Sequence, residues 1–160
     1  MKKSLQFTAV LLLLIVTANA QSGPRVEINI GPVLADSDEY FSVNVQGNFY
    51  YMWPTSEKID LGVTTGFSLF SGDRITEVFE SIPDLYVPVA VAGRIAIAQS
   101  FSMGADLGYG INVEGGGGFY YRPVIAYNFS ETLALTASFS SIIESEYTTS
   151  AFNLGVNFGF

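Results

Sequence analysis

Cysteine and histidine are both missing from the 160 residues of the sequence. Without cysteine there can be no disulfide, and without either residue a zinc site is not expected. A catalytic mechanism that depends on a histidine base is excluded for the same reason. We therefore expect no metal and no cofactor, and no residue pattern indicates an enzyme.

Positive charge is scarce as well. Seven lysines and arginines stand against 15 acidic residues, and charged residues make up only 14% of the chain. Nucleic-acid binding needs a basic surface, so no nucleic-acid partner is expected. The exterior of a soluble domain is normally about 25–35% charged. Since Lys58 is the only lysine after residue 20, this chain cannot cover its exterior in that way.

A long hydrophobic run occurs only near the N-terminus. Lys2 and Lys3 precede an apolar segment at 7–16, and the Ala-Asn-Ala sequence at 18–20 has the small residues of a cleavage site. We predict that residues 1–20 are a secretory signal peptide and that residues 21–160 form one domain. A membrane anchor is the alternative, but the apolar run is shorter than the roughly 18–20 residues that a membrane helix needs.

Strict alternation is the dominant pattern of the remaining chain. The last ten residues, AFNLGVNFGF, place an apolar side chain at every second position with asparagine or glycine between. A period of two is typical of a β-strand with two different faces. The same pattern recurs in seven earlier segments, which are 25–35, 41–53, 59–70, 85–97, 101–113, 119–129 and 133–140. The fold class predicted is all-β, an eight-stranded antiparallel up-and-down barrel.

The residues between the apolar positions decide which face is outside. They are mostly glycine, alanine, serine, threonine and asparagine. Small neutral side chains suit a crowded lumen, whereas a soluble barrel carries its charged face outside. Ten residues tilted by about 40° cover about 25 Å, the height of the apolar band of a membrane barrel. We predict a transmembrane barrel; the alternative is a soluble periplasmic ligand-binding barrel.

The signal peptide, the eight segments and the terminal Phe-Gly-Phe resemble the small outer-membrane β-barrel (porin-like, OmpA- or OmpX-type) family of Gram-negative bacteria. The stretches LYVPVAVAGRIA, LGYGINV and FYYRPVIAYNFS are similar to the strand pattern of that family. The resemblance implies export to the outer membrane and contact with its lipid. It also implies that Phe158 and Phe160 form the signal read by the barrel-assembly machinery.

Six charged residues are expected to face the lumen, namely Arg25, Glu27, Asp60, Arg94, Asp106 and Arg122. Buried charges must pair, and the interior of an eight-stranded barrel is filled by side chains. We predict a charge-balanced plug in which Arg94 and Arg122 neutralise Asp60, Asp106 and Glu27. The alternative is a gated ion path, which would make the protein a narrow porin for ions or small solutes.

The connections divide into two sets. Those expected at 54–58, 99–100 and 130–131 are short and are placed with the termini on the periplasmic side. The longer ones contain ten acidic residues and Arg74 as the only basic one; the acidic residues are Asp36, Asp38, Glu39, Asp73, Glu77, Glu80, Asp84, Glu114, Glu144 and Glu146. They indicate either a solvated rim, the simpler interpretation, or a site for divalent cations or a basic partner.

Within the second long connection the apolar residues follow a helical spacing. Ile75, Val78, Phe79 and Ile82 lie at i, i+3, i+4 and i+7, which is one face of a short helix. This face could pack on the rim or dock an extracellular or envelope protein. We therefore predict a non-enzymatic barrel with a structural or adhesive role through its loops. Three strand prolines, Pro32, Pro88 and Pro123, are expected near the outer ends, where they would make the pairing irregular.

Overall fold

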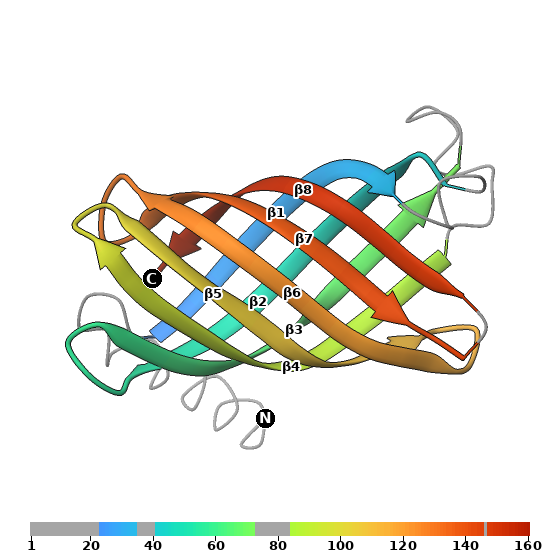
Figure 1. The fold of residues 1–160 in the computed structure, drawn as a ribbon, viewed down its shortest axis with the longest axis horizontal. Helices are drawn as coiled ribbons and strands as arrows, with labels where there is room; N and C mark the ends of the chain where they lie inside the picture. Colours follow the sequence, from blue (N-terminus) through green and yellow to red (C-terminus); the bar gives the residue numbers. More distant parts are fainter. Residues whose placement is uncertain (1–22, 35–40, 73–83, 146) are drawn as a thin grey trace, which may run out of the picture.

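The computed structural model describes residues 23–34, 41–72, 84–145 and 147–160. All eight predicted strands form, and each pairs antiparallel with its neighbour in the sequence. β8 also pairs with β1, which closes the sheet into a barrel (Figure 1). The strands are β1 (Gly23–Leu34), β2 (Val43–Pro54), β3 (Ile59–Ser71), β4 (Asp84–Ala98), β5 (Phe101–Asn112), β6 (Gly117–Asn128), β7 (Leu133–Ile143) and β8 (Thr148–Gly159).

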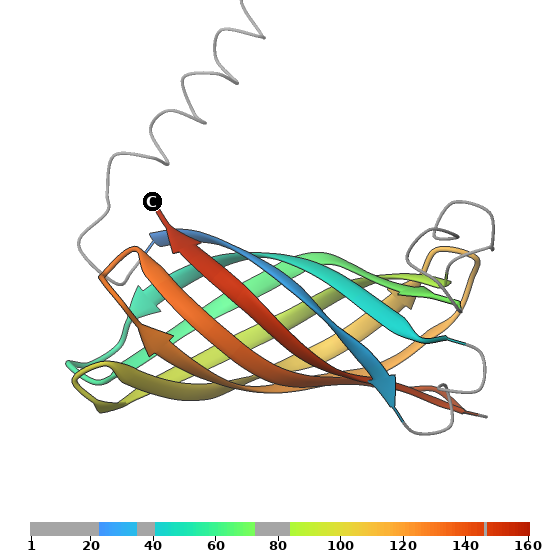
Figure 2. The ribbon, with the colours of Figure 1, turned by 90° about the horizontal axis from the view of Figure 1, so that it is seen from above.

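The barrel has two distinct ends (Figures 1 and 2). The terminal end carries the start of β1, the end of β8 and the connections 55–58, 99–100 and 129–132. The loop end carries the connections 35–42, 72–83, 113–116 and 144–147. The first two loop-end connections are longer, as predicted. The other two are tight because the strands extend further than the sequence indicated, and the glycine run at 115–117 turns with positive φ angles.

The two faces of the sheet differ sharply in polarity. Large apolar side chains point outward and are exposed, with Ile28 at 59% and Val91 at 62%, whereas the lumen residues Asn29 and Asp106 are at most 1% exposed. Among the described strand residues, no outward-facing side chain is charged. The apolar face is therefore on the outside, as a lipid-facing barrel requires. No helix within the described part of the chain has the length and apolar character to cross a membrane.

Aromatic rings gather near both ends of the outward surface. Near the terminal end, the rings of Tyr51 and Trp53 lie 5.1 Å apart, and Tyr127 packs against Phe101 and Phe129 at 5.0 and 4.9 Å. Near the loop end, Tyr121 packs against both Phe119 and Phe139. Two such belts of aromatic side chains mark the lipid–water boundaries of a membrane barrel.

Each of the three strand prolines lies where one ladder is interrupted. The gaps fall between Ile30↔Leu154 and Val33↔Ala151, between Thr65↔Val89 and Ser68↔Tyr86, and between Tyr121↔Ser141 and Val124↔Ser138. Proline has no N–H to donate, which explains the missing pairs. The predicted irregular pairing at the prolines is confirmed. The predicted position of Pro123 was wrong, because it lies in the middle of β6 rather than near the outer end of that strand.

Candidate functional site

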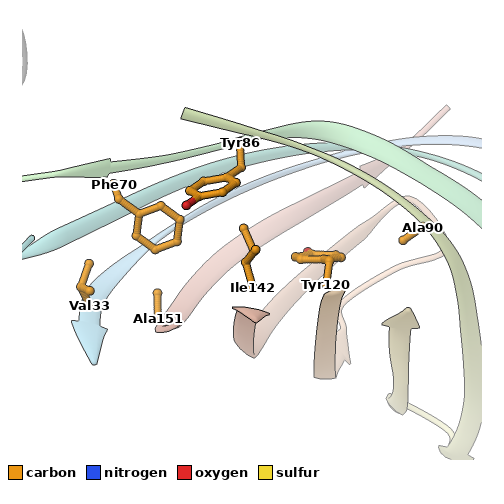
Figure 3. Packing of buried hydrophobic residues seen from close by; sticks show 7 residues of the cluster. All are labelled: Val33, Phe70, Tyr86, Ala90, Tyr120, Ile142 and Ala151. Carbon is orange, nitrogen blue, oxygen red and sulfur yellow. The ribbon is translucent and has the colours of Figure 1, made fainter. Parts of the chain in front are cut away.

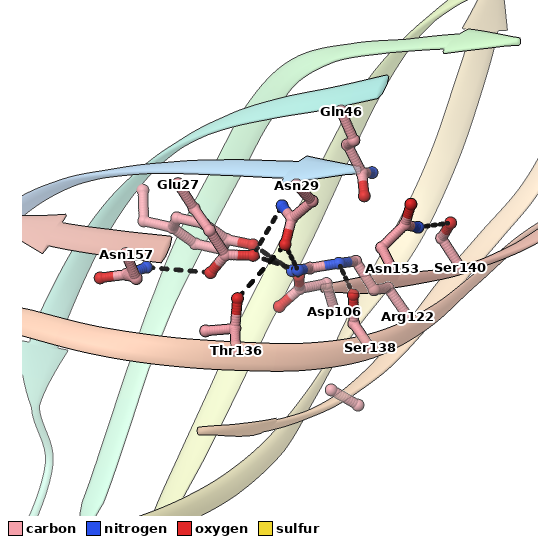
Figure 4. Close-up of polar contacts among 12 residues, drawn as sticks. Glu27, Asn29, Gln46, Asp106, Arg122, Thr136, Ser138, Ser140, Asn153 and Asn157 are labelled. Carbon is pink, nitrogen blue, oxygen red and sulfur yellow. Dashed lines mark hydrogen bonds and ion pairs between the residues drawn. The ribbon is translucent and has the colours of Figure 1, made fainter. Parts of the chain in front are cut away.

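Arg122 lies at the centre of the lumen and is fully buried (Figure 4). It comes from β6, where the ladder places it directly beside Asp106 of β5. Its guanidinium forms ion pairs with Glu27 of β1 and with Asp106, the latter at 3.1 Å. Its Nε donates to the Ser138 hydroxyl at 3.1 Å, and its Nη1 donates to the Tyr50 hydroxyl at 2.5 Å. Four strands thus hold one cation.

The carboxylates that face Arg122 have further partners. Glu27 accepts hydrogen bonds from the side-chain amides of Asn29 at 2.9 Å and Asn157 at 3.0 Å. Asp106 accepts from the Tyr50 hydroxyl at 3.0 Å, and its other oxygen lies 2.7 Å from Nη1 of Arg94.

Two arginines and two carboxylates therefore form one neutral network, which we call the lumen network (Glu27, Arg94, Asp106 and Arg122). The Arg94 guanidinium also lies 5.4 Å from the centre of the Tyr50 ring, close enough for a cation–π contact. Each charge of this network has at least one partner of opposite sign, the condition under which buried ions are tolerated.

The other two charged residues expected in the lumen lie toward the terminal end. Arg25 donates to the side-chain oxygen of Asn157 at 3.3 Å and to the backbone oxygen of Glu131 at 3.4 Å. Asp60 is the ladder neighbour of Arg94. The Arg94 guanidinium turns toward Asp106 instead and forms its ion pair there. The charges of Asp60 and Arg25 attract each other instead.

Sequence reasoning did not single out the neutral partners of the lumen network. Tyr50, Asn29, Ser138 and Asn157 supply five of its hydrogen bonds. Their alternation placed them on the inner face, but alternation gives no information about which inner residues share a height in the barrel. That height depends on the stagger between strands, which the sequence pattern does not contain.

A layer of apolar side chains fills the lumen on the loop side of the network (Figure 3). Its members are at most 6% exposed and come from six strands; they are Val33, Phe70, Tyr86, Ala90, Tyr120, Ile142 and Ala151. The Phe70 and Tyr86 rings meet edge to face at 5.9 Å. This apolar layer was not predicted, because the inner face was expected to be small and polar. The sequence signal was a break in alternation, with two large residues in succession at 69–70 and at 85–86 and three at 119–121.

A cavity of about 80 Å³ occupies the lumen on the terminal side of the network. Arg25, Asp60, Arg94, Ser102 and Asn128 are among its lining residues. Its size and polar walls suit several water molecules. A solute entering from the terminal end would meet Arg25 and Asp60 first, then the lumen network, and finally the apolar layer.

Hydrogen bonds also tie three of the loop-end connections together. Asp84, at the start of β4, accepts from the side-chain amide of Asn112 at 2.7 Å and from the hydroxyl of Tyr147 at 2.9 Å. The Tyr147 hydroxyl also lies 3.1 Å from that of Tyr86, a member of the apolar layer. Burial raises the pKa of the Tyr147 phenol, which keeps it protonated as a donor. These hydrogen bonds hold Asp84, the residue that directly follows the 72–83 connection, in place.

The remaining predicted residues are placed as follows. Phe158 and Phe160 point outward at the terminal end and are 44% and 63% exposed, and Phe158 pairs with Val26 and Leu133. The proposed helical face of Ile75, Val78, Phe79 and Ile82 lies outside the described residues. Within the part of the chain that the structure describes, no group of acidic residues is arranged to hold a metal ion.

Comparisons with known proteins agree with this geometry. The family model of the outer membrane protein beta-barrel domain matches residues 7–160. The fold is similar to the attachment invasion locus protein Ail of Yersinia pestis, with a TM-score of 0.61, 12% identity and coverage of 89% of this chain and 100% of that chain.

Two further solved structures are also similar. A de novo designed transmembrane β-barrel gives a TM-score of 0.55 at 13% identity, covering 88% of this chain and 97% of the design. The N-terminal β-barrel domain of Pseudomonas aeruginosa OprF gives 0.50 at 16% identity, covering 89% and 100%. No curated protein matches the sequence. At these identities the likeness concerns the fold alone.

Proposed function

The chain belongs to the outer membrane protein beta-barrel domain family, and we propose that it is a non-enzymatic barrel with a closed lumen that displays its loops at the cell surface. Family membership implies an outer-membrane location in a Gram-negative bacterium. We place the terminal end in the periplasm and the loop end outside the cell, because such barrels have short periplasmic turns and longer extracellular loops. We also propose that Phe158 and Phe160, which point outward at the terminal end, form the signal for the barrel-assembly machinery.

The observation that carries the closed-lumen proposal is the burial of Arg122 between Glu27 and Asp106. An ion that crossed the lumen would have to separate these paired charges and then pass the apolar layer. Separating paired buried charges is unfavourable, and an apolar constriction adds a dehydration barrier. A structural or adhesive barrel fits this arrangement better than a porin does.

We predict that the purified protein in a planar lipid bilayer gives no steady, discrete conductance steps at neutral pH. The alternative function, a narrow porin, is favoured by one feature, the polar cavity at the terminal end. Conductance separates the two functions directly. A general porin reconstituted in the same bilayers provides the positive control, and reproducible unit openings of this protein would refute the closed lumen.

The charge of the loop end restricts the chemistry of a partner. Ail was also solved with the heparin analogue sucrose octasulfate, a polyanion. In this chain the loop-end connections and the adjoining Asp84 carry ten acidic residues and one arginine. Like charges placed together at an interface are unfavourable, so we propose an extracellular or envelope protein partner that is neutral or basic at its contact surface.

We predict that the detergent-solubilised protein does not bind immobilised heparin at about 0.15 M salt, where surface charges act over about 8 Å. Repulsion by the acidic loops is the reason. A variant in which Asp73, Glu77 and Glu80 are changed to lysine serves as the matched comparison and should bind more strongly. If the unchanged protein bound the immobilised heparin, the proposal that the loops exclude acidic partners would be wrong.

A further inference from the structure

A groove of about 530 Å³ crosses the outward surface over β2, β3, β4 and β5. Its floor consists of short side chains, those of Val63, Thr65, Val89 and Val91, together with the backbone beneath them. Taller side chains form its walls, which are Phe49 and Tyr51 on β2 and Leu107 on β5. The ladders place these residues in two adjacent rows, one through Phe49, Thr65 and Val89 and the other through Tyr51, Val63, Val91 and Leu107.

The groove lies within the part of the surface that faces hydrocarbon. Val89 and Val91 are 52% and 62% exposed. Trp53 follows Tyr51 toward the terminal end, and Tyr109 pairs with Val89 on the loop side, so aromatic side chains flank the groove on both sides. No charged residue lines it. Its occupant must therefore be apolar.

The dimensions of the groove fit a single narrow occupant better than a second copy of the chain. A standard protein interface uses about 20–30 residues a side, whereas ten residues line this groove. The three strand spacings that it crosses, each about 4.8 Å, give a length of about 14 Å. An apolar cavity of about 150 Å³ already holds a benzene molecule, so this groove has room for a hydrocarbon chain.

We propose that this groove is a lipid site that holds one acyl chain of an outer-membrane lipid. The proposal rests on the membrane location given above and adds a defined position to it. Apolar solvent surrounds the barrel on all sides, so selectivity comes from close packing rather than from the hydrophobic effect. The β-branched floor residues are rigid about χ1, which lets a chain make many dispersion contacts without ordering the protein further.

Native mass spectrometry with added phospholipid tests the site. Val91→Phe fills the floor of the groove, and Val156→Phe makes the same change on the outward face of β8, away from it. We expect the unchanged protein and Val156→Phe to retain one phospholipid as detergent is stripped. Val91→Phe should reduce the lipid-bound fraction about fivefold.

Two results would overturn the proposal. Equal lipid retention by all three proteins would mean that the groove holds no lipid in particular. A dimer in the unchanged protein that Val91→Phe abolishes would assign the groove to a second copy. Membrane fractionation of the same variants keeps this test apart from the proposed function, because a barrel that stays in the membrane fraction can still fail the lipid test.

Discussion

Replacing Arg122 with methionine is expected to lower the free energy of unfolding by about 3–5 kcal/mol, the usual cost of removing one partner from a buried ion pair. Arg122 is fully buried and forms an ion pair with Glu27. Its removal leaves the Glu27 carboxylate in the lumen without the guanidinium that directly contacts it. Denaturant unfolding in lipid vesicles, followed by the fluorescence of the single tryptophan, Trp53, measures the change.

Two further variants separate the loss of charge pairing from a general loss of packing. In the double variant Arg122→Met with Glu27→Gln, both members of one pair are removed while Asp106 keeps Arg94. Stability should recover by more than half, because replacing a whole buried pair is often nearly neutral. Arg25→Met, in the partly exposed terminal mouth, should cost about 1 kcal/mol or less. Equal losses for Arg122→Met and Arg25→Met would show that the lumen network contributes no special stability.

Placing an arginine in the middle of the outward face is the second change with a large expected effect. Ile28 lies at the centre of β1 and is 59% exposed. If this side chain faces the bilayer midplane, Ile28→Arg should lower the free energy of unfolding by about 2–4 kcal/mol. The same unfolding experiment in lipid vesicles measures the loss.

Ile143→Arg is the matched control, because Ile143 also points outward but ends β7 at the loop end. Its cost should be only about 0–1 kcal/mol, as the arginine reaches the headgroup region there. The ratio of the two losses reports depth in the membrane. If both variants were neutral, or if both improved solubility without detergent, the outward face would be meeting water and the membrane assignment would be wrong.

Much of the fold could be read from the residues alone, because a strand's period of two is a local property. The alternation in AFNLGVNFGF assigns Phe152, Leu154 and Phe158 to one face and Asn153 and Asn157 to the other, whatever surrounds them. Eight such segments predict a β-barrel. Because they contain too few charged residues for a water-exposed surface, the barrel was expected to face lipid. The short terminal-end turns followed from the same spacing.

The contacts inside the lumen depend instead on how the strands are staggered when the sheet closes. Asp60 is the ladder neighbour of Arg94, yet Arg94 pairs with Asp106 of β5, and Arg122 reaches Glu27, which lies 95 positions away in the chain. The apolar layer likewise collects one or two residues from each of six strands. Local periodicity gives the face of each side chain but not its height along the barrel axis. Whether the lumen is open or closed is therefore a property of the assembled barrel and not of any single strand.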